Sequence, residues 1–448
     1  MGKINKANII KTLHYLRRNG VAAAFYAAME RLDSRREIPY MYHAPSTQEL
    51  ERQRCIRWEH APLLSILVPC YRTDKRYIKE LMESVLAQTY PNWELILADA
   101  TEDDSVVKRV SSYQDARILY VHLDNNGGIS DNTNAGVKAA HGEYIGLLDH
   151  DDLLTPDALY AMACRIRDKK AAGQKPRLLY SDEDKCSHDA LTFYEPHRKT
   201  NFNLDLLLSN NYICHFLMME RELMLKTGFR RAYDGAQDYD LVLRAVAQIL
   251  PWERDIVHIP KVLYHWRSHP GSTSENPGSK QYAYEAGRLA LQDFADGQGW
   301  KAKACHLKHV GYYKLEYQGG ILANRRDVGA VGGKLIRRGR ITGSIYQKDG
   351  TALYEGLPAK YSGYMHRAVL RQDAGAVDIR LLQVKKEARQ ILEQQLGYPY
   401  RTEKDGDCFD VSRLPEDTDY AALSLKLCRA LREAGYRIVW DPDLYRRI

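Results

Sequence analysis

A short apolar run that ends in three carboxylates occupies Gly142–Asp152. Its apolar part, Tyr144–Leu148, follows a glycine and is shorter than a typical helix, which favours a buried parallel strand. Asp149, Asp151 and Asp152 would then gather at the C-terminal end of that strand. Carboxylates taken out of water are costly unless something positive neutralises them. The pattern therefore favours a fold that places a positive partner at this strand end.

A divalent metal ion, Mn²⁺ or Mg²⁺, is the natural partner for these carboxylates. Such hard cations prefer oxygen ligands and usually also bind the phosphates of a substrate. The alternative is a solvated acidic turn, in which Asp152 or Thr155 caps a helix that starts near Pro156. A cap needs one acid rather than three, so the residues favour a metal and diphosphate site.

Strand and helix patterns alternate before this stretch. The predicted strands are Leu64–Val68, Trp93–Ala98, Ile118–Val121 and Tyr144–Leu148, and the helices between them are Tyr77–Gln88, Asp103–Tyr113 and Ser130–His141. Alternation with short turns predicts an α/β fold, in which a mostly parallel, Rossmann-like sheet carries helices on both faces.

The loops that follow these four strands hold most of the candidate binding residues. They are Pro69–Tyr71, Asp99, Asn125–Gly128 and Asp149–Asp152. In parallel sheets such loops meet at one edge, so the sequence predicts a single crevice. Neither GxxxxGK[ST] nor GxGxxG after the first strand is present, which disfavours a P-loop or dinucleotide site. Phosphate must be held another way, and this again favours the metal.

Further strands are predicted at Leu178–Tyr180, Tyr212–Met219 and Ile256–Ile259. The acidic run Ser181–Lys185 is interpreted as a solvated turn. Its alternative is a place near the crevice, because loops at strand ends often carry function.

Two more groups are candidates for the crevice. Asp238 and Asp240 open an amphipathic helix, either as a general base at the site or as acids favoured by the helix dipole. Trp266, flanked by His265 and Arg267 in a Pro/Gly-rich loop, has the chemistry to stack on a sugar and hold phosphate. A structural aromatic in a surface loop is the alternative.

Composition sets broad limits. The 448 residues suffice for two or three domains, and no apolar run approaches the roughly 20 residues of a membrane span. Eight cysteines without a CxxC pair predict reduced thiols in a cytoplasm. The net charge of +7 is compatible with nucleotide ligands or an anionic membrane surface, and we expect no nucleic-acid partner.

Three regions are predicted along the chain: a helical leader at 1–61, a main α/β domain at 62–300 and a tail at 301–448. In the leader, Lys6–Arg18 mixes apolar and basic residues, and Val21–Leu32 continues with apolar positions before a basic stretch at Arg31–Arg36. They predict either an amphipathic helix on a membrane surface or a helix packed on the main domain.

The region Leu63–Ser274 resembles family 2 glycosyltransferases, which have the GT-A fold. The matching motifs, in order, are Leu-Val-Pro-Cys-Tyr, Asp99, Asn126-Gly-Gly-Ile-Ser, Leu-Leu-Asp-His-Asp-Asp and Gly-Ala-Gln-Asp-Tyr-Asp-Leu-Val-Leu-Arg. Tyr-Ser-Asp-Glu-Asp-Lys, Asn-Tyr-Ile-Cys-His and Tyr-His-Trp-Arg-Ser-His-Pro-Gly-Ser-Thr are similar to bacterial enzymes of cell-surface polysaccharide assembly, of the O-antigen or rhamnan type.

The resemblance implies roles by position. Pro69, Tyr71, Asp99 and Asn126 would surround the nucleotide base, and Asp149 would also belong to the nucleotide site. Asp149 and Asp151 would be the DxD pair that holds the metal, and Asp238 would be the catalytic base. Asp152, Asp240, His265, Trp266 and Arg267 are further candidates for donor or acceptor contacts.

The implied reaction is an inverting transfer of a hexosyl or deoxyhexosyl group. The donor would be a nucleotide sugar, of the UDP or dTDP type, and the acceptor a glycan or lipid-linked glycan. The predicted location is the cytoplasm, with contact to the inner face of the cell membrane as an option.

The tail resembles the later half of a second family 2 unit, through Val328–Ile336 and Leu427–Pro442. The nucleotide-binding half is missing, and Asp417–Tyr420 is a loose counterpart of Gln237–Asp240. We therefore expect a non-catalytic unit. Packing, acceptor recognition, assembly and a decayed remnant all remain open, and a half-sheet would leave edges that need covering.

Two other functions compete with the transferase. A non-catalytic scaffold that binds nucleotide or sugar would be favoured by loss of Asp149, Asp151 or Asp238, but all three are present. A nucleotidyltransferase would want a glycine-rich basic loop after the first strand, and Cys70–Lys75 lacks the glycines.

Overall fold

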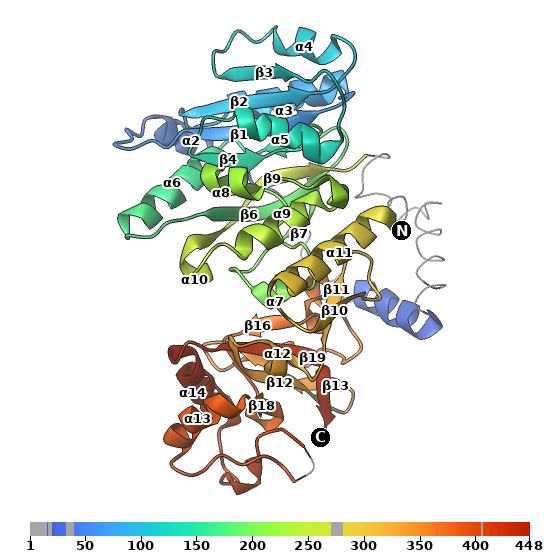
Figure 1. Cartoon of the computed structure of the whole chain (residues 1–448), viewed down its shortest axis with the longest axis vertical. Helices are drawn as coiled ribbons and strands as arrows, with labels where there is room; N and C mark the ends of the chain where they lie inside the picture. Colours follow the sequence, from blue (N-terminus) through green and yellow to red (C-terminus); the bar gives the residue numbers. More distant parts are fainter. Residues whose placement is uncertain (1–15, 17–19, 33–39, 270–280, 405) are drawn as a thin grey trace. The chain divides into compact units, whose positions relative to one another are not determined.

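The computed structural model describes residues 16, 20–32, 40–269, 281–404 and 406–448 (Figure 1). The chain forms two compact units. The larger unit comprises Pro39–Phe202 and Asn211–Phe294. The smaller unit comprises Met1–Ile38, Asn203–Asn210 and Ala295–Ile448. Most of the predicted stretch Lys6–Arg18 lies outside the described residues, as do residues 270–280 of the Pro/Gly-rich loop.

The larger unit is built on a nine-stranded sheet. Its strands run in the order β3-β2-β1-β4-β8-β6-β9-β5, and β7 also pairs with β6. The bounds are β1 Leu64–Cys70, β2 Trp93–Asp99, β3 Ile118–His122, β4 Tyr144–Leu147, β5 Leu153–Leu154, β6 Leu178–Cys186, β7 Phe193–His197, β8 Leu217–Glu220 and β9 Ile256–Arg267. The four neighbours β3, β2, β1 and β4 are parallel, as are β6 and β9. The predicted α/β fold is confirmed.

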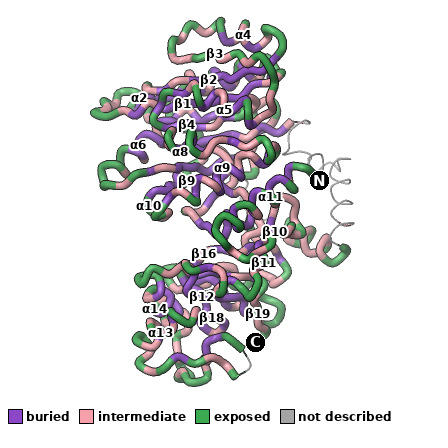
Figure 2. The backbone as a smooth tube through the Cα atoms, viewed as in Figure 1, coloured by how far each residue is buried: buried purple, intermediate pink, exposed green. Residues whose placement is uncertain are grey.

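Helices cover this sheet. They are α2 Thr47–Arg54, α3 Lys75–Leu86, α4 Ser105–Val110, α5 Ile129–Ala139, α6 Ala158–Ala171, α8 Arg221–Thr227, α9 Gln237–Val246, α10 Trp252–Asp255 and α11 Gln281–Gly297. Helix α3 shows why they form. Asp74 caps it by accepting from the Arg76 amide at 2.8 Å, and a stripe including Ile78 and Leu81 enters the core. Figure 2 shows β1 and β2 buried beneath the helices.

Three sequence expectations for the second half of the sheet were wrong. Ser181–Lys185 is not a solvated turn, because β6 continues through it and Asp182, Glu183 and Asp184 are buried. Strand β9 continues past Ile259 to Arg267, so His265–Arg267 lie in a strand rather than a loop. The strand expected at Tyr212–Met219 begins only at Leu217. The hydropathy pattern did not predict that β6 and β9 continue through these charged residues, because each buried charge has a partner far away in the sequence.

The smaller unit holds a second, five-stranded sheet, with order β13-β12-β19-β16 and β18 paired to β12. The bounds of its main elements are α7 Leu204–Leu207, β10 Ala302–His306, β11 Tyr313–Tyr317, α12 Ile321–Asn324, β12 Val328–Arg337, β13 Arg340–Gly343, β16 Gln372–Ala374, β18 Leu382–Val384, α13 Arg389–Leu396, α14 Tyr420–Glu433 and β19 Arg437–Arg447. Short strands β14 Ile345–Tyr346, β15 Ala352–Leu353 and β17 Ala376–Val377 form a separate three-stranded sheet. Residues 20–32 form a helix.

The smaller unit repeats the pairing of the larger one. Strand β12 is antiparallel to β18 and parallel to β19, as β6 is to β8 and β9. In each unit, one residue of the central strand is opposite a residue on both of its neighbours. Leu178 is opposite Met219 and Ile256, and Ala330 is opposite Val384 and Ile438. Helices α13 and α14 lie between β18 and β19 in the chain, as α8 and α9 lie between β8 and β9. That this unit is the later half of a second family 2 unit stays a prediction.

The outer edge of β18 is covered by the unit's own chain. Gln383 is bridged to Cys408, and the Phe409 amide donates to the Leu382 carbonyl at 2.7 Å. In the larger unit, β4 occupies the corresponding place beside β8. This edge of the half-sheet is therefore covered by the chain itself. Among the described residues, no helix is long and apolar enough to cross a membrane.

Candidate active site

The ends of β1 and β2 lie side by side, because Cys70 is directly opposite Asp99. Pro69 is buried in β1, and Tyr71 follows the strand. The fully buried Asp99 carboxylate accepts from the Thr101 amide at 3.0 Å and from the Tyr120 hydroxyl at 2.8 Å. Its position at the sheet edge agrees with the sequence expectation, while Tyr120 was not foreseen.

The side chains of two other candidate nucleotide-binding residues form hydrogen bonds that stabilise the loops in which they lie. The Tyr71 hydroxyl donates to Glu102 at 3.0 Å. The Asn126 side chain accepts from the Gly128 amide and from Asn132, both at 3.0 Å. These bonds fix the loops after β1 and β3, which flank the end of β2.

The acidic cluster after β4 is tied down by Tyr264 of β9. The Tyr264 hydroxyl donates to Asp152 Oδ2 at 2.5 Å and accepts from the Asp149 amide at 3.2 Å. Asp152 is buried, and burial, followed by Asp151 and Asp149, raises the pKa of its carboxyl well above the ordinary value. The Asp149 side chain is about half exposed (53%). Asp152 thus anchors the turn, and Asp149 faces outward.

Asp151 meets a histidine that the sequence analysis did not single out. His269 Nε2 lies 2.8 Å from Asp151 Oδ2, and both side chains are about one-fifth exposed. The Asp151 carbonyl accepts from Arg267 Nε at 2.6 Å, which fixes the backbone here. An imidazole beside a carboxylate at a strand end is a common pair of metal ligands.

His215 stands at the centre of the site. Its Nε2 is 3.6 Å from Asp149 Oδ2 and its Nδ1 is 3.3 Å from Glu183 Oε2. Its ring stacks on Tyr264, with centroids 4.6 Å apart, and the Trp266 ring lies 5.7 Å away. Burial lowers the pKa of His215, but Cys214, Asp149 and Glu183 raise it, and the net shift is well upward.

Behind His215 lies a buried ion network. Glu183 contacts Lys199 Nζ at 3.3 Å and His197 Nδ1 at 3.2 Å, and it accepts from the His215 amide at 3.1 Å. Burial raises the pKa of Glu183, but Lys199 and the two histidines outweigh it and hold the pKa well below its ordinary value. The acid that sequence reasoning assigned to a solvated turn thus supports the centre of the site.

Asp238, the second residue of α9, faces the same segment. Its Oδ2 accepts from Asn211 Nδ2 at 2.7 Å and lies 3.8 Å from Cys214 Sγ. Burial is the main cause that raises the pKa of Asp238. Because Cys214 precedes His215, this short segment links the candidate base to the acidic cluster after β4.

Three of the residues predicted to contact the donor or acceptor are paired with charged side chains inside the fold. Asp240 is buried and paired with Arg230 and Arg244. His265 Nδ1 lies 2.5 Å from Asp184. Arg267 is fully buried, its amide donates to Asp152 at 2.7 Å and its guanidinium pairs with Glu80 at 2.7 Å. These three stabilise the strands around the site. Among His265, Trp266 and Arg267, only Trp266 lies near His215 and has a partly exposed side chain.

The donor atoms of this region fit a divalent cation. Ligand atoms of Asp149, Asp152 and His215 lie within 4.8 Å of one another, and so do those of Glu183, Cys214 and His215. The first set offers oxygen and nitrogen, and Asp151 with His269 adds the same donors nearby. Mn²⁺ and Mg²⁺ favour carboxylate oxygen, so these residues match the predicted metal better than a thiolate site would.

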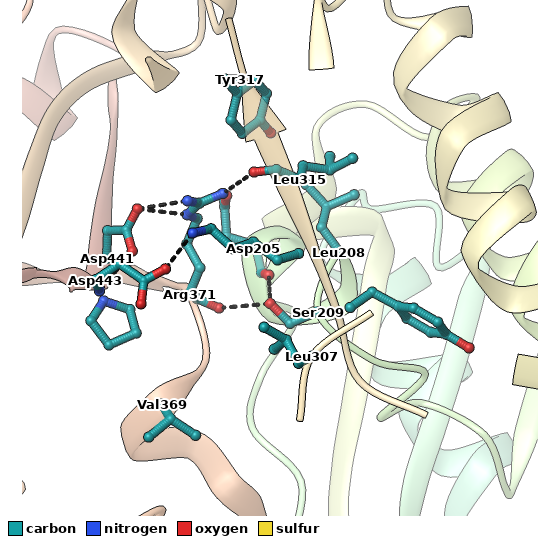
Figure 3. Close-up of a pocket in the computed structure, with 13 residues that line it drawn as sticks. Asp205, Leu208, Ser209, Leu307, Leu315, Tyr317, Val369, Arg371, Asp441 and Asp443 are labelled. Carbon is teal, nitrogen blue, oxygen red and sulfur yellow. Dashed lines mark hydrogen bonds and ion pairs between the residues drawn. The ribbon is translucent and has the colours of Figure 1, made fainter. Parts of the chain in front are cut away.

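A small cavity in the smaller unit is a packing feature (Figure 3). Arg371 crosses it, pairing with Asp441 at 2.6 Å and donating to the Leu315 carbonyl at 2.9 Å. The space is about 20 Å³, room for one water molecule. Its charges are paired within the unit, and the acidic cluster of the larger unit is the candidate active site.

Residues 65–228, from β1 to α8, match the family model described as glycosyl transferase family 2. This domain belongs to glycosyl transferase family 2. The match covers Asp99 and the acidic cluster, together with Glu183 and His215. It confirms the family and the GT-A type of fold that the resemblance implied. Asp238 and His269 lie beyond the matched residues.

Similar proteins match between about half and two thirds of this chain. Uncharacterized protein y4gI of Sinorhizobium fredii (strain NBRC 101917 / NGR234) is 42% identical over 241 residues, 53% of this chain and 26% of the relative. The O-antigen biosynthesis protein RfbC of Myxococcus xanthus is 29% identical over 275 residues, 60% of this chain and 21% of the relative. The chain thus spans about a quarter of the first and a fifth of the second.

Among solved structures, S. aureus TarS 1-349 in complex with UDP is similar at 20% identity. The TM-score is 0.39, and the alignment covers 51% of this chain and 64% of that one.

Proposed function

We propose that the chain is an inverting glycosyltransferase that moves a hexosyl or deoxyhexosyl group from a nucleotide sugar to a hydroxyl group. The family 2 domain supports transfer from an activated sugar. The observation that carries the proposal is the link between the acidic cluster and Asp238. Asp149 contacts His215, and the neighbouring Cys214 contacts Asp238.

The donor site would lie at the ends of β1, β2 and β4. Pro69, Tyr71, Asp99 and Asn126 lie on or beside the ends of β1, β2 and β3, where the nucleotide base would bind. Asp149 and Asp151, with His215 and His269 nearby, would hold the divalent ion. The bound ion would neutralise charge on the departing diphosphate. We propose a pyrimidine nucleotide, of the UDP or dTDP type, as in the resemblance stated above.

Asp238 would act on the acceptor. Its carboxylate takes the proton of the acceptor hydroxyl as that oxygen attacks the anomeric carbon. The attack must come from the face opposite the leaving diphosphate, so the base has to belong to a different segment than the acidic cluster. Asp238 on α9 meets this requirement. A single displacement of this kind inverts the anomeric configuration.

The acceptor class follows from the relatives rather than from the geometry. RfbC is named as an O-antigen biosynthesis protein, so we propose a glycan or lipid-linked glycan of the cell surface as acceptor. We further propose that the protein works in the cytoplasm, at the inner face of the cell membrane.

Asp238→Asn tests the mechanism. The amide keeps the size of the side chain but cannot accept a proton, so we expect transfer to fall at least about a hundredfold. Donor binding should persist, because Asp238 does not belong to the acidic cluster. Binding is measured by calorimetry with UDP or dTDP and Mn²⁺, and transfer by release of the nucleotide.

Retained turnover in Asp238→Asn would exclude this residue as the base. Failure of the wild-type protein to bind any nucleotide, with or without metal, would favour the non-catalytic scaffold instead.

A further inference from the structure

The helix at residues 20–32 presents an apolar face to solvent. Val21, Phe25, Met29 and Leu32 follow one another at intervals of four, four and three residues, which places them on one side of a helix. Their exposed fractions are 76, 59, 37 and 55%. They form a continuous apolar stripe, which we call the 21–32 stripe.

The opposite side of this helix contacts the loop at residues 360–363 of the same unit. Glu30 accepts from the Ser362 amide at 3.1 Å, from the Ser362 hydroxyl at 2.9 Å and from the Gly363 amide at 2.6 Å. The Tyr26 ring lies 4.7 Å from Lys360 Nζ. At about 100° per residue, Tyr26 and Glu30 point away from the stripe. Polar contacts therefore orient the helix so that its apolar side faces outward.

This orientation is the reverse of that usual in a globular protein. A surface helix ordinarily turns its apolar stripe to the core, because removing apolar area from water is the main favourable term in folding. A contiguous exposed stripe instead marks a surface that another apolar phase covers.

The net charge of the N-terminal residues indicates which apolar phase covers the stripe. Residues 1–38 hold eight Lys or Arg and three Asp or Glu, so they carry +5 of the chain's net +7. An apolar helix face among basic residues is the composition of helices that lie in the headgroup region of anionic bilayers. Lys360, at the helix contact, and Arg367, whose guanidinium lies over the Tyr364 ring, add positive charge in the smaller unit.

A second copy of the chain is the other candidate to cover the stripe. The four exposed side chains offer on the order of 400 Å², whereas each partner of a stable protein interface buries roughly 800 Å². The stripe is therefore too small to hold a dimer by itself, but an apolar patch with adjacent basic charge suffices for reversible binding to a bilayer.

We propose that the 21–32 stripe docks the protein on anionic phospholipid bilayers. Phe25 and Met29 enter the headgroup and acyl boundary, while the net positive charge of residues 1–38 favours an anionic surface. This surface is distinct from the candidate active site and needs no nucleotide, metal or acceptor.

Vesicle co-sedimentation of the full chain tests the proposal, with pure phosphatidylcholine compared against phosphatidylcholine mixed with phosphatidylglycerol. We expect wild type to pellet with the anionic vesicles and to be released by high salt. Phe25→Gln/Met29→Gln should lower the bound fraction at least about tenfold, since both side chains leave the apolar phase. Glutamine is a good helix former, so the helix itself should persist.

The matched control is Leu191→Gln/Leu289→Gln, which removes two leucines that are 78 and 42% exposed in the larger unit. It should bind vesicles like wild type. Wild type that stays in the supernatant, or a stripe variant that pellets as well as wild type, would overturn the proposal. So would light scattering that finds a wild-type dimer, a monomeric stripe variant and no vesicle binding by either. Transferase activity is not read out, so the result does not depend on the proposed reaction.

Discussion

Asn211 donates from its side-chain amide to Asp238 Oδ2 at 2.7 Å. The Cys214 thiol lies 3.8 Å from the same oxygen. Burial raises the pKa of Asp238, and a donor on the carboxylate opposes that rise. We propose Asn211 as a positioning residue for the proposed base: its hydrogen bond orients the carboxylate and favours the charged form.

Asn211→Ala should lower kcat about tenfold, the cost of losing one hydrogen bond to a charged group. The acid limb of the pH–rate profile should move to higher pH. The base must be ionised, activity falls as pH drops through its pKa, and loss of the donor raises that pKa further. Steady-state rates across pH measure both effects.

Asn92→Ala is the matched control. Asn92 likewise donates a side-chain hydrogen bond, to the Ala61 carbonyl at 2.8 Å, but it lies outside the site. An acid limb that does not move in Asn211→Ala, with kcat lowered equally in both variants, would reduce Asn211 to a purely structural residue.

Lys199→Met should destabilise the larger unit by about 3–5 kcal/mol, the usual cost of leaving a buried charge unpaired. The Lys199 side chain is fully buried, and it is the cation that contacts Glu183 and the Ile213 carbonyl. Urea denaturation at neutral pH measures the loss.

Adding Glu183→Gln to that variant should recover part of the lost stability, because the uncompensated carboxylate is then gone. The recovery will be incomplete, since Glu183 also contacts His197 and His215. A loss below about 1 kcal/mol in Lys199→Met would contradict a desolvated ion pair.

Metal should control nucleotide binding. With UDP or dTDP at about a hundredfold its Kd, ligand binding stabilises the folded state by about 2.7 kcal/mol and raises Tm. We expect this shift with Mn²⁺, its loss in a chelator, and its absence in Asp151→Asn. Thermal melts with each combination measure it.

Asp103→Asn serves as the control for that series, because Asp103 is an exposed acid outside the cluster that bonds the Ser105 amide at 2.8 Å. An equal shift with and without chelator would show that the site holds the diphosphate without a metal ion.

Acid should destabilise the smaller unit through His366. Burial first, and the neighbouring His309 second, lower the pKa of His366 to about 3. Its ring stacks on His309 with centroids 3.8 Å apart, and its Nδ1 has no hydrogen-bond partner among the described residues. The unfolded chain binds a proton near pH 6.5, so stability is present above that pH and falls by about 1.4 kcal/mol per unit below it.

His366→Asn should flatten this acid loss without disturbing the backbone, because φ is 60° here and asparagine tolerates that region. Denaturation at neutral and mildly acidic pH compares it with wild type. His122→Asn, at an exposed histidine, should change nothing; an unchanged slope in His366→Asn would place the acid sensitivity elsewhere.

Local patterns sufficed for the first half of the sheet. Strands β1 to β4 agree with their predicted ranges to within two residues at each end, because each is an apolar run punctuated by glycine, proline or acids. The acidic cluster and its place at a strand end were equally readable, since strand polarity alone puts Asp99 and Asp149 at one edge of a parallel sheet.

Ion-pair partners that are distant in the sequence could not be predicted from local patterns. Glu183 was assigned to a solvated turn because a charged run normally stays in water. Its burial is stabilised by ion pairs with Lys199, His197 and His215. His265 and Arg267 were candidates for substrate contact, yet Asp184 and Glu80 take up their charges inside the fold.

The α/β class, the family and the acidic strand end could be inferred from local patterns, because they depend on periodicity and on short motifs. Only the packed fold shows which acids are anchors and which face outward, that His215 lies beside Asp149 and Asn211 beside Asp238, and that the 21–32 stripe points to solvent. The physical reason is that burial and ion pairing depend on groups distant in sequence, such as Asp149 and His215, and these are brought together only by the packed sheet.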